Sequence, residues 1–144
     1  MELDRSLYRQ LICEKIPLNS NIITNTPFIS KIKATISIDD YITRILKYAK
    51  CSDIAFILSM IYLRRIQNTF GNEVYNKHSF HRLYISSIVV ATKFIDDDYC
   101  NNKYYAAVGG INVKELNLLE ISFLSYIKFD LYVTHDELVD IFNI

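Results

Sequence analysis

Residues 79–98, SFHRLYISSIVVATKFIDDD, are the segment that most restricts how this chain can fold. On a helical wheel, their Ile, Val, Tyr and Phe side chains cover most of the circumference. Because such a helix is stable in water only when other helices surround it, the segment predicts the central member of a helical bundle. Lys93 lies in its second half, where a buried cation would need a partner.

Turn-forming residues are scarce, and apolar residues recur at helical spacing. The 144 residues include 3 Gly and 2 Pro, and 51% of them are hydrophobic, enough for a sizeable core. We therefore predict an all-α fold. Helices are expected over residues 3–14, from an N-cap at Ser37 to 49, from Ser52 to the break at Gly71, over 79–98, from an N-cap at Asn112 to 127, and from a capping box at 134–137 to 142, with a helical turn over 103–107.

Two parts of the chain are distinguished by their breakers. Residues 1–36 are expected to form an N-terminal helix and a long irregular connector, because Pro17 and Pro27 interrupt any helix there. Residues 37–144 are expected to form the main helical domain.

Charge and cysteine content exclude several classes of protein. Lys+Arg and Asp+Glu are both 16, so there is no basic excess for nucleic acid. The longest apolar run, residues 54–63, is too short to span a bilayer, and the first residues lack a signal-peptide pattern. Cys13, Cys51 and Cys100 are odd in number and far apart, which predicts reduced, mostly packed thiols. We expect a protein of the cytoplasm or nucleus, with no membrane contact and no homo-oligomer.

Lys93 falls on a narrow polar stripe of its helix. The wheel places Arg82 and Ser86 on the same stripe and sets Val89 and Val90 close beside the lysine. We therefore expect a surface on which a lysine is set in valine. An ordinary solvated lysine is the alternative interpretation.

Glu120 interrupts the apolar face of the helix predicted over residues 112–127, between Leu116, Leu124 and Ile127. A buried carboxylate is costly unless it is paired or accepts hydrogen bonds. Two interpretations follow. Either an Arg, Lys or Tyr of the same chain satisfies Glu120, or the carboxylate is an acceptor held for a docking protein.

Catalytic and metal-binding patterns are poor. His78 and His81 have too few acidic or thiol residues nearby to predict zinc, and His135 belongs to a capping box. The acidic run at residues 96–98 lacks the glycine-containing loop of a calcium site. Because no nucleophile, base and oxyanion hole come together, we expect neither catalytic residues nor a cofactor.

Four segments, taken in order, resemble a cyclin box: YITRI at residues 41–45, SFHRL at 79–83, VATKF at 90–94 and VGGINVKELNLLEISFL at 108–124. More narrowly, they are similar to P-type cyclins, the family typified by the yeast phosphate-signalling cyclin and the plant U-type cyclins. The resemblance covers about residues 37–143. It implies a five-helix cyclin box and a non-enzymatic subunit that binds and activates a Ser/Thr cyclin-dependent kinase, in phosphate signalling or the cell cycle.

The resemblance also implies a kinase-binding site. In the family, a lysine of the third helix and a glutamate of the fifth contact the kinase's regulatory helix, and the matching residues are Lys93 and Glu120. Val89, Val90 and Leu124 would supply apolar contact beside them. The alternative is a cyclin-fold adaptor that binds another protein without activating a kinase.

One family feature is absent from the sequence. Many cell-cycle cyclins recruit substrates through a Met-Arg-x-Ile-Leu helix and a nearby tryptophan. Here residues 43–46 read TRIL and the chain has no tryptophan, so substrate recruitment by that route is not expected.

Overall fold

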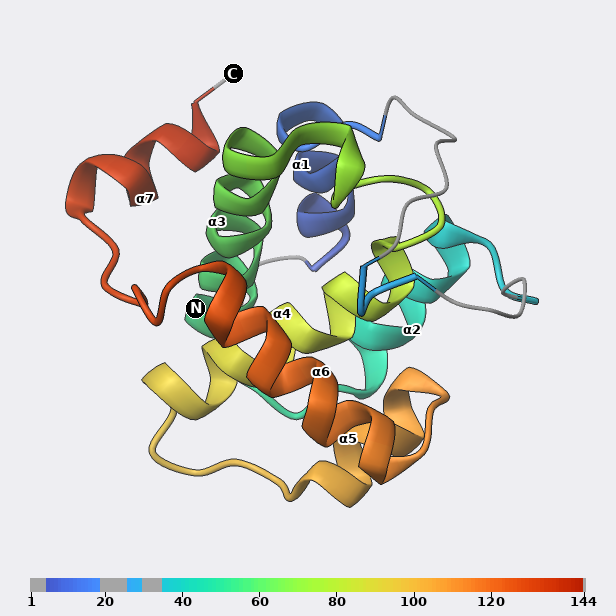
Figure 1. The fold of residues 1–144 in the computed structure, drawn as a ribbon. Helices are drawn as coiled ribbons and strands as arrows, with labels where there is room; N and C mark the ends of the chain where they lie inside the picture. The colour runs from blue at the N-terminus through green and yellow to red at the C-terminus, as the bar shows by residue number, and fades with distance from the viewer. Residues whose placement is uncertain (1–4, 19–25, 30–34, 144) are drawn as a thin grey trace.

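The computed structural model describes residues 5–18, 26–29 and 35–143, and these ranges contain helices and no strand (Figure 1). The prediction of an all-α fold is confirmed. The elements are α1 (Ser6–Lys15), α2 (Ile38–Tyr48), α3 (Asp53–Phe70), a 3-10 turn η1 (Gly71–Glu73), α4 (Phe80–Ile95), α5 (Asn102–Gly109), α6 (Val113–Tyr126) and α7 (His135–Phe142).

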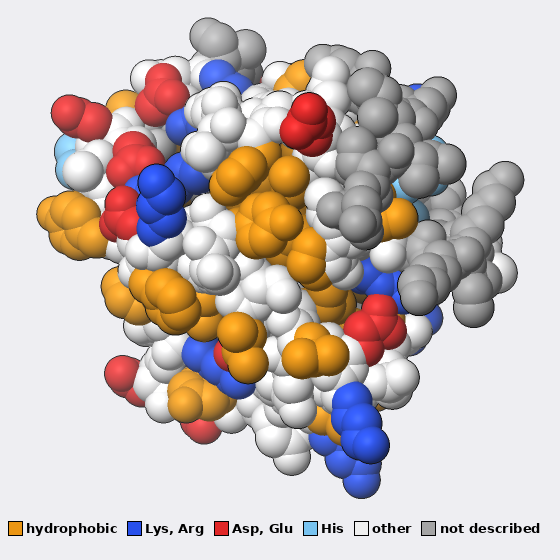
Figure 2. Space-filling model, viewed as in Figure 1, with side chains coloured by type: hydrophobic (Ala, Val, Ile, Leu, Met, Phe, Trp, Pro, Cys, Tyr) orange, Lys and Arg blue, Asp and Glu red, His pale blue; other side chains and the backbone are white. Residues whose placement is uncertain are grey.

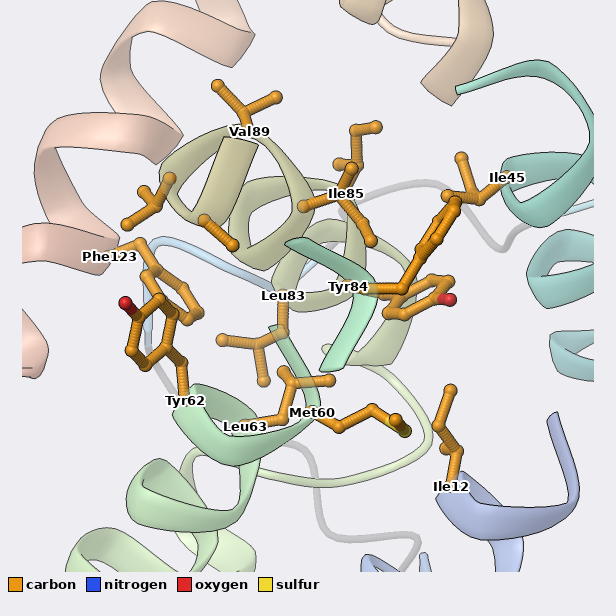
Figure 3. Close-up of a cluster of buried hydrophobic side chains, with 14 of the residues drawn as sticks. Ile12, Ile45, Met60, Tyr62, Leu63, Leu83, Tyr84, Ile85, Val89 and Phe123 are labelled. Carbon is orange, nitrogen blue, oxygen red and sulfur yellow. The ribbon is translucent and has the colours of Figure 1, made fainter. Parts of the chain in front are cut away.

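The helix α4 lies in the centre of the bundle, as its apolar circumference predicts. It packs against α2, α3, α5 and α6, and all its residues from 83 to 92 are buried. In Figure 3, its side chains stand between Tyr62 of α3, Ile45 of α2 and Phe123 of α6. The buried Ser86 and Ser87 donate their hydroxyl hydrogens to carbonyls of α4 itself, so they leave no unpaired polar group in the core.

The ends of α4 differ from the predicted span of residues 79–98. The hydroxyl of Ser79 donates to the carbonyl of Val74 and does not cap the helix. At the other end, the carboxylate of Asp96 accepts hydrogen bonds from the backbone N–H of Ser52, over 2.9 Å, and from its hydroxyl. The chain is extended at Asp96, so α4 ends at Ile95 and the acidic residues that follow lie outside it.

Capping residues explain where the other helices begin. Side chains of the expected residues accept backbone N–H groups at the start of α2, α3, α6 and α7, and α7 has the predicted capping box. The turn predicted over residues 103–107 is a full helix, α5. Asn101 caps its start, and Gly110, with φ of 69°, ends it.

The described N-terminal residues pack on the same core as the later helices. Tyr8, Leu11 and Ile12 of α1 are buried, and α1 contacts α2 and α3. Phe28 is fully buried, and its ring centroid lies 5.2 Å from that of Tyr126 on α6. Residues 19–25 and 30–34 of the predicted connector lie outside the described residues. The division at residues 36 and 37 stays a prediction.

Two of the three cysteines, Cys51 and Cys100, pack against the core, in line with the prediction of mostly packed thiols. Cys13 is exposed on α1, while Cys51 and Cys100 are half-buried, and all three are free thiols. Burial raises the pKa of Cys51 to about 12, so this thiol stays protonated. Among the described helices, none combines the length and the apolar character needed to cross a bilayer.

Candidate functional site

Lys93 and Glu120, the two charged residues that stand out in the sequence, form an ion pair. Lys93, near the end of α4, donates from Nζ to both carboxylate oxygens of Glu120 on α6, over 2.9 and 3.0 Å. The packing of α4 against α6 brings these residues together across 27 positions of sequence. The side chains are 30% and 16% exposed, so the pair lies at the surface of the bundle.

The donor that Glu120 requires therefore comes from its own chain, as the first of the two interpretations holds. The second interpretation, an acceptor held for a docking protein, also stands, because both groups can form further hydrogen bonds. A lysine ammonium has three N–H groups and a carboxylate can accept about four hydrogen bonds. A protein that docks here can still bond to both groups.

Asn102, the first residue of α5, is a third member of the site, which no sequence pattern predicted. Its Nδ2 donates to Oε1 of Glu120 over 2.9 Å and to Oδ1 of Asn117 over 2.7 Å. The available signal was the Asn101-Asn102 pair at a helix start. Only one asparagine can cap the helix, so the other is available for a different contact.

The prediction that Val89 and Val90 flank Lys93 at the surface is wrong. Their side chains are 0% and 3% exposed, because neighbouring helices cover α4 on all sides as far as Thr92. The polar stripe of the wheel also fails at Ser86, which is fully buried. Leu124, one turn beyond Glu120 on α6, is half-buried and packs against the core.

Other apolar residues occupy the surface next to the pair in sequence. Phe94 follows Lys93 and is exposed, and Leu118 and Ile121 of α6 are 68% and 63% exposed. Figure 2 shows hydrophobic side chains at several places on the face that α6 crosses, with charged side chains among them. Exposed apolar residues next to an ion pair are typical of protein interfaces; of these three, Leu118 is two residues from Glu120 and therefore lies on another side of α6.

The histidines do not assemble a metal site. Within the described ranges, no group of three or more His, Cys, Asp or Glu residues is placed to hold a metal ion. Nε2 of His81 lies 2.9 Å from the carbonyl oxygen of Ile36, and burial lowers the pKa of this histidine. His81 therefore links α4 to the residues before α2, and the site as a whole is suited to hydrogen bonding and packing.

Comparison with known proteins identifies the family. The sequence model of the Cyclin family matches residues 12–131. Cyclin-U4-1 of Arabidopsis thaliana is 47% identical over 102 residues, 71% of this chain and 50% of that protein. Cyclin-P4-1 of Oryza sativa subsp. japonica is 43% identical over 102 residues, 71% and 48% of the two chains. The PHO85 cyclin-like protein psl1 of Schizosaccharomyces pombe is 38% identical over 128 residues, 87% and 53%.

The chain spans about half the length of the curated relatives it matches. Its matched region includes all of α2–α6, that is, α4 and the four helices that pack around it, together with the end of α1. These helices form a cyclin box, and the chain belongs to the cyclin family, among its U- and P-type members.

Proposed function

We propose that this chain is a regulatory subunit that binds a Ser/Thr cyclin-dependent kinase and activates it without doing chemistry itself. Its family, and its likeness to a PHO85 cyclin-like protein, support a kinase as the partner. The observation that carries the proposal is the partly exposed pair of Lys93 and Glu120. These residues occupy the third and fifth helices of the box, where the family resemblance implies the kinase contact.

The pair offers a donor and an acceptor side by side. Two N–H groups of Lys93 are directed at Glu120, and the third is available for a backbone carbonyl of the kinase. Oε2 of Glu120 accepts one hydrogen bond from the described residues, so it can accept another. The first N–H groups of a helix have no partner within that helix, so the start of the kinase's regulatory helix fits this acceptor.

Apolar residues next to the pair in sequence would complete the contact. Phe94, which follows Lys93, and Ile121, which follows Glu120, are exposed in the free chain and would be buried by the kinase. Excluding water there strengthens the hydrogen bonds of the ion pair. Fixing the regulatory helix in this way would bring the kinase's own Lys–Glu pair and metal-binding Asp into place, which accelerates phosphoryl transfer.

A first experiment measures kinase binding and activation. The immobilised chain is exposed to an extract of its source cells, the recovered kinase is identified by mass spectrometry, and the purified pair is then titrated. Lys93→Ala or Glu120→Ala should weaken the complex by about 2–5 kcal/mol and reduce phosphoryl transfer to a peptide substrate. Lys77→Ala, which removes an exposed lysine from the turn before α4, is the matched control and should leave both unchanged.

A charge exchange separates docking from folding. The double variant Lys93→Glu/Glu120→Lys keeps an ion pair between α4 and α6 but reverses donor and acceptor. We expect it to remain folded but to unfold at a somewhat lower urea concentration than the wild type, because Asn102 loses its acceptor, and to lose kinase binding. If it binds the kinase as tightly as the wild type, the pair serves the fold alone. A wild-type chain that neither recovers nor stimulates a kinase would favour the adaptor alternative.

A further inference from the structure

The side chain of Asn102 is held between two residues of α6. Its Nδ2 donates to Glu120 over 2.9 Å and to Asn117 over 2.7 Å. An amide nitrogen carries two hydrogens, so both are used. Since Asn117 and Glu120 lie about one turn apart, this single nitrogen ties the start of α5 to the middle of α6.

The two hydrogen bonds that Nδ2 donates fix the orientation of the Asn102 side-chain amide. Oδ1 of Asn102 is buried and has no hydrogen-bond partner among the described residues, which carries a desolvation penalty. Turning the amide over would not help, because Oδ1 would then face the carboxylate of Glu120 and the amide oxygen of Asn117, both acceptors. The side chain therefore keeps the orientation in which it donates to Glu120.

This donation restricts the carboxylate of Glu120. The terminal torsion of a glutamate is broad, so a lysine alone would leave the carboxylate free to turn. Here Oε1 accepts from Lys93 on α4 and from Asn102 on α5, each over 2.9 Å, while Oε2 accepts from Lys93 alone within the described chain, over 3.0 Å. Oε2 can consequently accept a further hydrogen bond, and the contacts of Oε1 fix its position.

We infer that Asn102 is a positioning residue of the docking site, which anchors Oε1 of Glu120 so that Oε2 is presented to the backbone amides of the partner helix. The inference rests on the proposed function and deepens it, because it names the group that directs the carboxylate. An acceptor already held in place loses less freedom when the complex forms. Asn102 thereby contributes to affinity without touching the kinase.

The first test uses the isolated chain. Asn102→Asp places a carboxylate against Glu120 and should lower the urea midpoint of unfolding. Adding Glu120→Gln supplies a donor opposite the new acceptor, so the midpoint should recover. Asn68→Asp makes the same chemical change on an exposed residue in the last turn of α3, where the helix dipole disfavours a negative charge only weakly, and should lower the midpoint much less. If the losses from Asn102→Asp and Glu120→Gln simply add, the positioning contact is refuted.

The second test uses the complex with the kinase that the wild-type chain recovers. Asn102→Asp should bind about tenfold more weakly or worse, mainly through faster dissociation. Should this variant fold poorly, Asn102→Ala removes the donor without adding a charge and gives the same readout. Binding of a folded Asn102→Ala chain within about twofold of wild type would overturn the positioning role. Failure of the wild-type chain to bind any kinase instead overturns the proposed function, whatever the urea midpoints show.

Discussion

Gly109 lies where α5 approaches α4 so closely that a side chain has no room. A Cβ added there would lie 2.8 Å from Cγ1 of Ile85 and 3.2 Å from the hydroxyl oxygen of Tyr41. Neither neighbour can yield easily, because Ile85 is fully buried and the Tyr41 hydroxyl donates to the carbonyl of Gly109 over 2.8 Å. Overpacking costs about 1–3 kcal/mol. Because Gly109 is the last residue of α5, alanine's better helix propensity returns only about 0.5 kcal/mol, so Gly109→Ala should destabilise the chain by about 0.5–2.5 kcal/mol.

Urea and thermal unfolding, followed by circular dichroism, measure this loss. For a chain of this size, the melting temperature should fall by about 2–4 °C per kcal/mol. Ile85→Ala frees the space, so the two substitutions together should cost less than the sum of their separate losses. Gly110→Ala is the control: its Cβ meets no described atom within 4 Å, but its φ of 69° strains any alanine. Its loss should simply add to that of Ile85→Ala. Additive losses for Gly109→Ala and Ile85→Ala, or an unchanged Gly109→Ala, would refute the packing argument.

Other regions of the chain give three further predictions. Lys128 has a φ of 55° in the turn that ends α6, so Lys128→Gly should stabilise by about 0.5–1 kcal/mol, and a lower melting temperature would contradict this. Burial lowers the pKa of His81, so the unfolded chain binds more protons than the folded chain. The urea concentration at the midpoint of unfolding should therefore decrease as the pH is lowered from about 7.5 to about 5.5. His81→Gln should flatten that slope. Arg65 donates to the carbonyl of Tyr132 over 2.7 Å and to the carboxylate of Glu137 over 2.9 Å, so Arg65→Ala should cost about 1–3 kcal/mol and speed chymotrypsin cleavage at Tyr132. Equal cleavage rates would argue against this anchoring role.

The helices could be predicted because their signals are local. Apolar spacing, the capping side chains and the Gly110 stop act within about one turn of helix, and they place α2, α3, α6 and α7 closely. The end of α4 could not be predicted in this way. It depends on the contact of Asp96 with Ser52, a residue 44 positions earlier in the chain.

The candidate site was predicted only in part. Lys93 and Glu120 stand out in the sequence because each is a charged residue on an apolar helix. The resemblance to P-type cyclins points to the same two residues. A wheel treats a helix as if it were alone, so it placed Val89 and Val90 at the surface, although helices on every side bury them. Asn102 is a polar residue at the start of its helix and does not interrupt an apolar face. No pattern within α5 therefore distinguishes it as a site residue.

The sequence by itself determined the all-α class, the order of the helices, the central place of α4 and the identity of the two unusual charges, since periodicity, caps and apolar circumference are properties of neighbouring residues. Only the tertiary structure decided that Lys93, Asn102 and Glu120 meet, which oxygen of the carboxylate stays available, and which apolar residues remain exposed. Those outcomes depend on how α4, α5 and α6 pack, and packing joins residues that no local pattern connects.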